Sequence, residues 1–362
     1  MKKIQRKPVE ASEQGVAKRA LKRALINISV FLILMFATFW FIFKDQDLNE
    51  ILDVTRQANG LFIALGVLCM FGYFMMEAWN ISTLLKSFGE KVSLMKALKF
   101  TFIGFFFCSV TPGASGGQPL EIYYMTREKI SGANATLAIL IQTCGIQFAV
   151  TIFGIICAII GHSMLGGAVL WLFIIGLIIN GAALLILLLC IFRTNIIKKI
   201  LQKFIGFLAR HKLISAEKWK DKIDTGLDKY QDGSAYIKKH RSEFVTAILK
   251  TFCQMTFFFL IPFCVYKAFN LSGYNIFTLF TMQSILFVAT SGLPLPGAIG
   301  ASESVFLSLY GAVFGEGLLS SAMLLNRGIN FYWFVIVSMI VVLLNMILKK
   351  NGGVEITPPK RR

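Results

Sequence analysis

The chain has 362 residues, of which 56% are hydrophobic and only 15% are charged, and its mean hydropathy is +0.68. Soluble domains carry about 25% charged residues, so this composition excludes a soluble globular protein. The apolar content also excludes an intrinsically disordered chain. The net charge is nevertheless +18.

This charge is confined to three segments, which are 1–24 (+6), 193–241 (+8) and 349–362 (+4). The rest of the sequence is neutral overall. A nucleic-acid-binding domain would gather basic residues on a folded polar surface, and no segment of this sequence is long and polar enough to form one. Basic segments that flank apolar runs are typical of the cytoplasmic side of a membrane protein.

The first apolar runs have the length of membrane spans, because about 20 apolar residues cross a bilayer core of about 30 Å. Ala24–Phe43 is uncharged, and its long basic leader and the lack of a cleavage site predict a first span rather than a signal peptide. Gln57–Met76 predicts a second span. Phe100–Leu120 is uncharged but is interrupted at Thr111-Pro112-Gly113.

The later runs complete the pattern. Ile130–Phe192 lacks Asp, Glu, Lys and Arg and is too long for one crossing. Its glycine-rich stretches near Gly161-His162-Ser163 and Gly166-Gly167 predict a division into two spans. The remaining segments are Thr246–Lys267, Ala268–Ser302 (which is broken at Pro294 and Pro296-Gly297) and Gly328–Leu348.

These segments predict an all-α polytopic integral membrane protein with six to eight transmembrane helices, including two broken or re-entrant segments. The positive-inside rule places the basic segments in the cytoplasm. We divide the chain into a basic N-tail, a first membrane half, a basic cytoplasmic loop, a second membrane half and a basic C-tail, with the bounds 1–23, 24–192, 193–245, 246–348 and 349–362.

The basic loop contains apolar residues at helical spacing from Ile196 to Leu208, with lysines between them. This pattern fits an amphipathic helix on the anionic cytoplasmic face of a membrane. A charged connector that only sets the orientation of the chain fits equally well, so both interpretations stay open.

The two proline breaks share the pattern P-G-A-x-G. The first is TPGASGGQPLE (111–121) and the second is LPGAIGASE (295–303). Proline and glycine interrupt helices, and broken backbone is tolerated at membrane depth only inside protein or beside a watery cavity. The predicted topology enters the two breaks from opposite sides, as an inverted repeat requires. The alternative is a pair of kinks that lets helices pack closely.

Secondary transporters direct the N-termini of broken helices at anionic groups near the membrane midplane. The corresponding backbone here is at Pro112, Gly113, Gly116, Gly117, Pro296, Gly297 and Gly300. Charged residues within apolar segments usually face a bundle interior or cavity. Our candidates for binding a lipid headgroup are Arg127, Arg327, Glu121, Glu303 and Gln118, and our candidates for buried charges are Glu77 and Glu316.

The two arginines suit a phosphate group, because a guanidinium binds phosphate through planar paired hydrogen bonds. The two glutamates either pair with these arginines or contact a cationic headgroup. Arg127 has an equally good alternative, in which it marks a cytoplasmic boundary together with Glu128 and Lys129.

No metal or nucleotide site is visible in the sequence. The seven cysteines contain no C-x-x-C pair, the three histidines are scattered, and neither a Walker A nor a Rossmann pattern occurs. We therefore expect no metal, no cofactor, no catalytic residue and no ATP-driven transport by this chain alone.

The segments TPGASGGQPLEIYYM (Thr111–Met125) and GLPLPGAIGASESVF (Gly292–Phe306) resemble the flippase-like membrane domain of lysylphosphatidylglycerol synthases, the multiple peptide resistance factor family of bacteria. The resemblance covers the chain from about Leu25 to Leu348. It implies a protein of the bacterial inner membrane, with both termini cytoplasmic, that moves or binds phospholipid of the phosphatidylglycerol or lysyl-phosphatidylglycerol class. It also implies roles in lipid transport and antibiotic resistance.

Two other functions stay open. Family members carry a soluble domain that transfers lysine from lysyl-tRNA to phosphatidylglycerol. Only 14 residues follow Leu348, so we expect no such enzyme activity from this chain alone, unless it is a partner subunit of a lysyltransferase. If the lysyltransferase alternative holds, lysyl-tRNA would be a partner; otherwise we expect no nucleic-acid partner. The other alternative is a membrane scaffold, and the sequence leaves open whether the chain forms a homo-oligomer.

Overall fold

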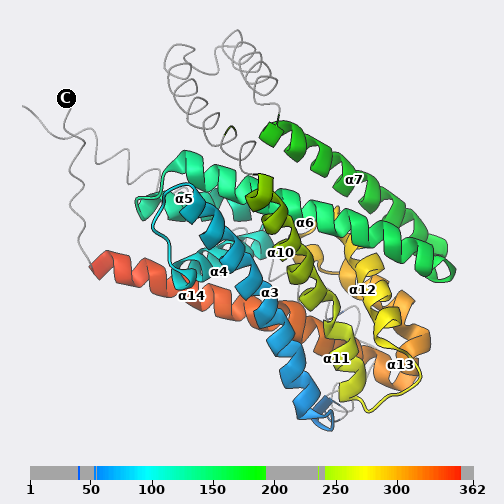
Figure 1. The fold of residues 1–362 in the computed structure, drawn as a ribbon. Helices are drawn as coiled ribbons and strands as arrows, with labels where there is room; N and C mark the ends of the chain where they lie inside the picture. The colour runs from blue at the N-terminus through cyan, green and yellow to red at the C-terminus, as the bar shows by residue number, and fades with distance from the viewer. Residues whose placement is uncertain (1–39, 41–52, 54, 193–234, 236–240, 352–362) are drawn as a thin grey trace, which may run out of the picture.

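The structure is a computed structural model that describes residues 40, 53, 55–192, 235 and 241–351 (Figure 1). Every regular element in these ranges is a helix, so the prediction of an all-α fold is confirmed. The elements are α3 (Gly60–Ser87), α4 (Leu94–Val110), η1 (Pro112–Ala114), α5 (Gly117–Arg127), α6 (Gly132–Ile160), η2 (His162–Met164), α7 (Gly167–Phe192), α10 (Arg241–Phe259), α11 (Ile261–Ala268), α12 (Ile276–Ser291), η3 (Pro296–Ala298), α13 (Ala301–Arg327), η4 (Gly328–Tyr332) and α14 (Trp333–Asn351).

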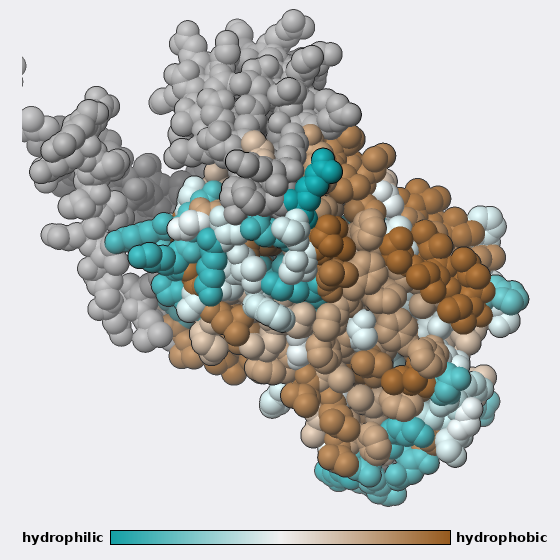
Figure 2. Space-filling model, in the orientation of Figure 1, coloured by the Kyte–Doolittle hydropathy of each residue, from teal (hydrophilic) through white to brown (hydrophobic). Residues whose placement is uncertain are grey.

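The outer surface of the helices is apolar. Within the described residues, five helical stretches are long and apolar enough to cross a membrane, and these are Gly60–Ser87, Gly132–Ile160, Gly167–Leu189, Arg241–Ala268 and Pro296–Met346. Large apolar side chains such as Trp171, Ile178 and Leu185 on α7 are exposed. Figure 2 shows hydrophobic residues over much of the visible face and hydrophilic residues gathered toward its ends. Such a surface needs lipid around it, which confirms a polytopic membrane protein.

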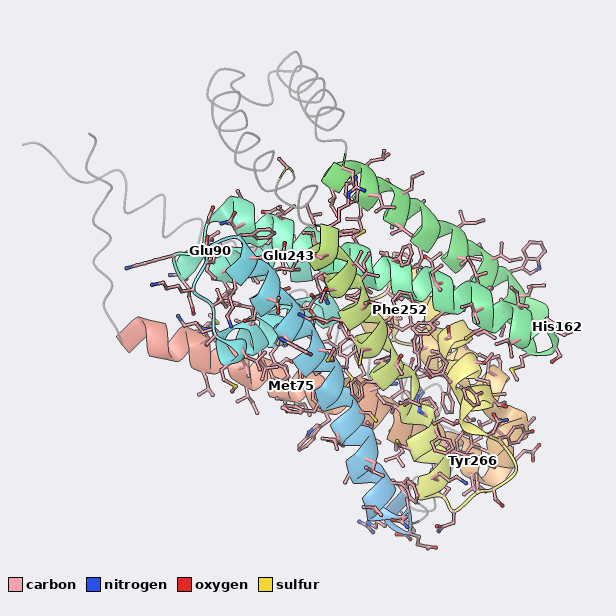
Figure 3. The ribbon with its side chains drawn as sticks, in the orientation of Figure 1. Met75, Glu90, His162, Glu243, Phe252 and Tyr266 are labelled. Carbon is pink, nitrogen blue, oxygen red and sulfur yellow. The ribbon has the colours of Figure 1, made fainter. Side chains whose placement is uncertain are left out.

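The two ends of the helical body carry different connections. Figure 3 shows Glu90 and Glu243 at one end, and His162 and Tyr266 at the other. Glu90 lies in the loop before α4, and Glu243 lies at the start of α10, directly after the basic loop. The loop between α3 and α4 and the first turn of α10 therefore lie at the same end of the helical body, which agrees with the predicted topology.

The first broken segment is a re-entrant hairpin. Lys99 near the start of α4 forms an ion pair with Glu128, which follows α5. Further in, the backbone of Gly104 lies against the side chain of Glu121, and that of Gly117 lies against Cys108. These contacts pair α4 with α5 in antiparallel order, so the chain enters from the Glu90 end, turns at η1 and returns to the same end.

The second broken segment is followed by a helix, α13, that reverses direction within its own bounds. The Nε atom of Arg327 lies 2.7 Å from Oε1 of Glu303, which is 24 residues earlier in α13. A straight helix would separate them by about 36 Å. Gly315, with φ 67° and ψ 169°, breaks the helix, so α13 consists of two antiparallel arms, 301–314 and 316–327.

The first arm of α13 forms the second re-entrant hairpin with α12. The hydroxyl of Tyr310 lies 3.4 Å from the carbonyl oxygen of Leu279 and from Oε1 of Gln283, both on α12. This hairpin enters from the other end of the body, because the backbone N–H of Tyr274, just before α12, donates to the hydroxyl of Tyr266. The two hairpins therefore enter from opposite ends.

The tips of the two hairpins have the same backbone and touch each other. Gly113 in η1 has φ 60° and ψ 27°, and Gly297 in η3 has φ 59° and ψ 16°. Both positions need the left-handed conformation that glycine adopts freely. A Cβ atom on Gly113 would lie 4.0 Å from the Cα atom of Pro294. The predicted repeat is thus present as two like turns that meet inside the protein.

Several predicted bounds need correction. The division of Ile130–Phe192 at η2 is confirmed, but α3 continues eleven residues beyond Met76. Thr246–Lys267 is two helices, α10 and α11, with Pro262 at the start of the second. We did not predict the two helical arms of 303–327, because Glu303, Glu316 and Arg327 interrupt the apolar sequence there. The predicted first span (Ala24–Phe43) and the amphipathic segment 196–208 lie outside the described residues.

Gly176 on α7 tests this packing. A Cβ atom there would lie 1.9 Å from the carbonyl oxygen of Val288 on α12. Gly176→Ala should therefore lower stability by about 1–3 kcal/mol through overpacking, measured as a lower thermal midpoint of the detergent-purified protein. Gly181→Ala on the same helix is the control, since nothing lies within 4 Å of that site. Equal midpoints for the two variants would contradict the close seat of α7 on α12.

Candidate functional site

A cavity of about 310 Å³ lies beside the hairpin tips. Helices from both halves of the chain line it, from α3 and α6 to α12 and α13. Its polar lining includes Glu77, Gln118, Glu121, Asn326, Arg327 and Asn330. A volume of this size is within the range of small-ligand sites, which begin near 300 Å³.

A buried ion pair closes the second hairpin tip. Besides its bond to Nε of Arg327, Oε1 of Glu303 accepts the hydroxyl of Tyr332 at 2.9 Å. Oε2 of Glu303 accepts the backbone N–H of Gly300 at 2.7 Å, and Nη2 of Arg327 donates to the carbonyl of Gly297 at 3.1 Å. Both side chains are buried, so this pair satisfies the backbone groups that the break leaves open.

The first tip uses a hydroxyl instead. Oγ1 of Thr111 donates to the carbonyl of Phe107 at 2.6 Å and accepts the backbone N–H of Gly116 at 2.9 Å. One short side chain thus bridges the end of α4 and the start of α5. The carboxylate of Glu121 is therefore not needed to hold the turn. Its side chain makes no hydrogen bond to the described residues of the tip.

Three buried oxygen atoms that belong to cavity-lining residues have no hydrogen-bond partner within the described part of the chain. They are Oε1 of Glu121, Oδ1 of Asn326 and Oδ1 of Asn330. These residues are 4%, 1% and 4% exposed. An unpartnered buried acceptor is costly, so these atoms point to an occupant that donates hydrogen bonds.

The charges around the cavity are unequal. Among the described lining residues, Glu77 and Glu121 are acidic and Arg327 is basic. Arg327 is already paired with Glu303, so two carboxylates remain without a cationic partner in the described part of the protein. Charges at membrane depth need compensation, and an occupant with a positively charged group would supply it.

The structure brings most of the predicted site residues to one place. Glu121, Gln118 and Arg327 line the cavity, and Glu303 lies directly behind Arg327. Glu77 also lines it and is partly buried. The predicted backbone positions form or flank the hairpin tips, and these are Pro112, Gly113, Gly116, Gly117, Pro296, Gly297 and Gly300.

Two predicted residues lie elsewhere. Arg127 is exposed at the end of α5, 5.7 Å from the ring of Tyr123, and does not line the cavity. Its place at the Glu90 end favours the boundary interpretation. Glu316 is exposed rather than buried, because it directly follows the turn at Gly315. The expectation of a buried charge at Glu316 was therefore wrong.

Buried amides are the site residues that the sequence prediction missed. Asn80, Gln142 and Gln254 are 1%, 3% and 0% exposed, and Asn326 and Asn330 reach the cavity from the end of α13 and from the π-helical turn η4. Their signal was present, because amide side chains are unusual in lipid-facing positions and often join helices. Apart from Gln118, the side chains we weighed as binding candidates were charged.

The family comparison agrees with this architecture. The family model for the lysylphosphatidylglycerol synthase TM region matches residues 25–338. The chain belongs to this family. The match covers both hairpins and every cavity-lining element of the described structure.

An archaeal membrane protein is also similar to this chain. A UPF0104 membrane protein of Archaeoglobus fulgidus is 23% identical over 273 residues, which cover 74% of this chain and 82% of the archaeal protein. Its name describes a membrane protein and assigns no activity.

The buried ion pair gives a direct test of the second tip. Arg327→Met should destabilise the protein by about 3–5 kcal/mol, because it leaves the carboxylate of Glu303 buried without its partner. Arg127→Met is the matched control, since Arg127 is exposed, and should leave the thermal midpoint unchanged. A double Glu303→Gln/Arg327→Met variant should regain part of the loss. Equal midpoints for the two single variants would rule out this role of Arg327.

Proposed function

We propose that this protein binds phospholipid headgroups in the cavity beside the hairpin tips and moves them between the two leaflets of a membrane. The observation that carries this proposal is the meeting of two re-entrant tips at a cavity whose lining includes charged and amide side chains, inside a body with an apolar outer surface. A headgroup crosses hydrocarbon only if polar contacts replace its hydration, and this cavity offers such contacts.

The lining suggests how a headgroup is held. Arg327 keeps N–H groups beyond those donated to Glu303 and Gly297, since a guanidinium has five. A phosphate lies between this guanidinium and the start of α5, where Gln118 also reaches the cavity. Glu121 accepts hydrogen bonds from the hydroxyl or ammonium groups of the head. This arrangement suits phosphatidylglycerol and its lysylated form.

The opposite entry of the two hairpins supports alternating access. Each hairpin is joined to its own end of the body, and the two hairpins touch at their tips, where η3 meets η1 and α4. A small displacement of one hairpin against the other would open the cavity to one end while the other stays closed, as in transporters built from inverted repeats. The acyl chains stay in lipid beside the apolar faces of the helices.

We assign the protein to the inner membrane of a bacterium, with both termini and the basic loop in the cytoplasm. The support is the charge of +6, +8 and +4 on the three basic segments, together with the position of the α3–α4 loop and of the start of α10 at one end of the described body. There the basic segments contact anionic lipid surfaces. A pure scaffold would not require unpartnered acceptors around a cavity.

A vesicle assay tests this function. The purified protein is placed in vesicles of phosphatidylethanolamine and phosphatidylglycerol that contain a trace of acyl-labelled fluorescent phosphatidylglycerol or its lysylated form. The exchange between leaflets is followed by dithionite quenching of the outer leaflet. Wild type should accelerate exchange above empty vesicles, and Glu121→Gln should slow it about tenfold by removing one charge-assisted hydrogen bond.

Glu316→Gln is the control for this assay, because it removes an exposed carboxylate that lies outside the cavity. It should keep the wild-type rate. The proposed function fails if wild type behaves like empty vesicles with both labelled lipids. The cavity assignment fails if Glu121→Gln and Glu316→Gln exchange lipid equally fast.

A further inference from the structure

Three buried amides connect Glu77 to the interior of the helical body. Nδ2 of Asn80 donates to Oε1 of Gln142 at 2.6 Å, Nε2 of Gln142 donates to Oε1 of Gln254 at 2.8 Å, and Nε2 of Gln254 donates to Oε2 of Glu77 at 2.8 Å. The chain joins α3, α6 and α10. Its last member, Glu77, is the one that carries a charge and lines the cavity.

The direction of this chain is fixed at both ends. Nδ2 of Asn80 also donates to the backbone carbonyl of Ala247 at 3.1 Å. A carbonyl oxygen only accepts hydrogen bonds, so Asn80 must present its nitrogen, and each following amide must then present its oxygen backward and its nitrogen forward. A carboxylate stands at the other end, which also accepts. Every donor in the chain therefore points toward Glu77.

A one-directional chain favours the ionised form of its final acceptor. Hydrogen bonds to a charged acceptor are stronger than neutral ones, and aligned bonds polarise one another in a low-dielectric interior. If the amide groups were flipped, Oδ1 of Asn80 would face the carbonyl oxygen of Ala247, and two acceptors would meet without a donor. The observed orientation of the amides leaves Oδ1 of Asn80 without a hydrogen-bond partner in the described residues. The protein tolerates this cost.

Glu121 has no comparable support. Its buried Oε1 is unpartnered within the described part of the chain, whereas Glu77 holds a hydrogen bond from a side chain that is 0% exposed. Neither Asn80 nor Gln254 lines the cavity. Any influence of these two residues on a cavity ligand must therefore pass through a neighbour that lines the cavity, which is Gln142, Glu77 or the Tyr73 hydroxyl beside Gln254.

We propose that Asn80, Gln142 and Gln254 are positioning residues that present Glu77 to the cavity as an ionised carboxylate, and that Glu77 binds the positively charged part of a lipid headgroup. This inference rests on the proposed function for the kind of ligand. It adds a specific carboxylate and the buried groups that orient it. An amide cluster that served only to hold three helices together would have no need to end on a cavity carboxylate.

The test compares binding of two short-chain lipids to the detergent-purified full chain. The probes are phosphatidylglycerol and its lysyl ester, which differ only in the cationic lysyl group. Wild type should prefer the lysyl ester. Gln254→Met keeps the length of the side chain but removes the donor to Glu77, so the preference should fall about tenfold, with the affinity for unlysylated phosphatidylglycerol changed less than about twofold.

A double-mutant cycle separates positioning from general destabilisation. In a Glu77→Gln background, which has no charge to orient, Gln254→Met should change the preference no further. Gln147→Met is the matched control. Gln147 is on α6 with Gln142, but it belongs neither to the row of hydrogen-bonded amides nor to the cavity lining. It should keep the wild-type preference, and thermal midpoints of all variants identify any that fail to fold.

The outcomes separate this inference from the proposed function. The inference is overturned if wild type shows no preference for the lysyl ester, if Gln254→Met retains it, or if the effects of Gln254→Met and Glu77→Gln simply add. If Gln254→Met is unfolded, Asn80→Leu replaces it in the same cycle, with the same expected loss. Selective binding without leaflet exchange in vesicles would support the inference and count against translocation.

Discussion

A chain that breaks its helices inside an apolar body must find hydrogen-bond partners for the backbone groups it exposes, and the whole site depends on how this is done. At the second tip, Glu303 and Arg327 meet this need together. They bind each other, the N–H of Gly300 and the carbonyl of Gly297. Arg327 comes 24 residues after Glu303, so the two can meet only if the helix between them reverses direction. The break at Gly315 provides this reversal.

The two repeats meet this need differently, and the difference creates the cavity's character. Thr111 holds the first tip with one hydroxyl group, so the acid of that repeat, Glu121, has no structural partner in the described residues and faces the cavity. The second acid, Glu303, is neutralised by Arg327. A sequence repeat that looks nearly symmetric thus yields one structural carboxylate and one available for a ligand.

Composition and hydropathy predicted the membrane class, most helices and both breaks, because these features depend on local sequence. Glu121 and Arg327 were found because charges stand out in apolar runs. The fold-back of α13 was not predicted, since a glycine in an otherwise helical stretch gives no sign of a reversal. Arg127 was chosen as a binding candidate because an arginine follows each break. A residue at the end of a helix can, however, lie at the exposed end of the helical body and away from the cavity. The amide chain requires three helices to come together, which no local pattern reports.

The sign of the charge in the cavity is the opposite of that of the protein as a whole. The net charge of +18 is carried by segments at the ends and in one loop, whereas the described cavity lining has two carboxylates beyond its neutral ion pair. We propose that the basic segments concentrate anionic lipids at the membrane surface without selecting among headgroups. On this proposal, selection falls to the cavity, where a phosphate would meet an arginine that is already paired and an ammonium group would meet carboxylates that are not. That balance of charges would favour a headgroup that carries both signs over one that carries only negative charge.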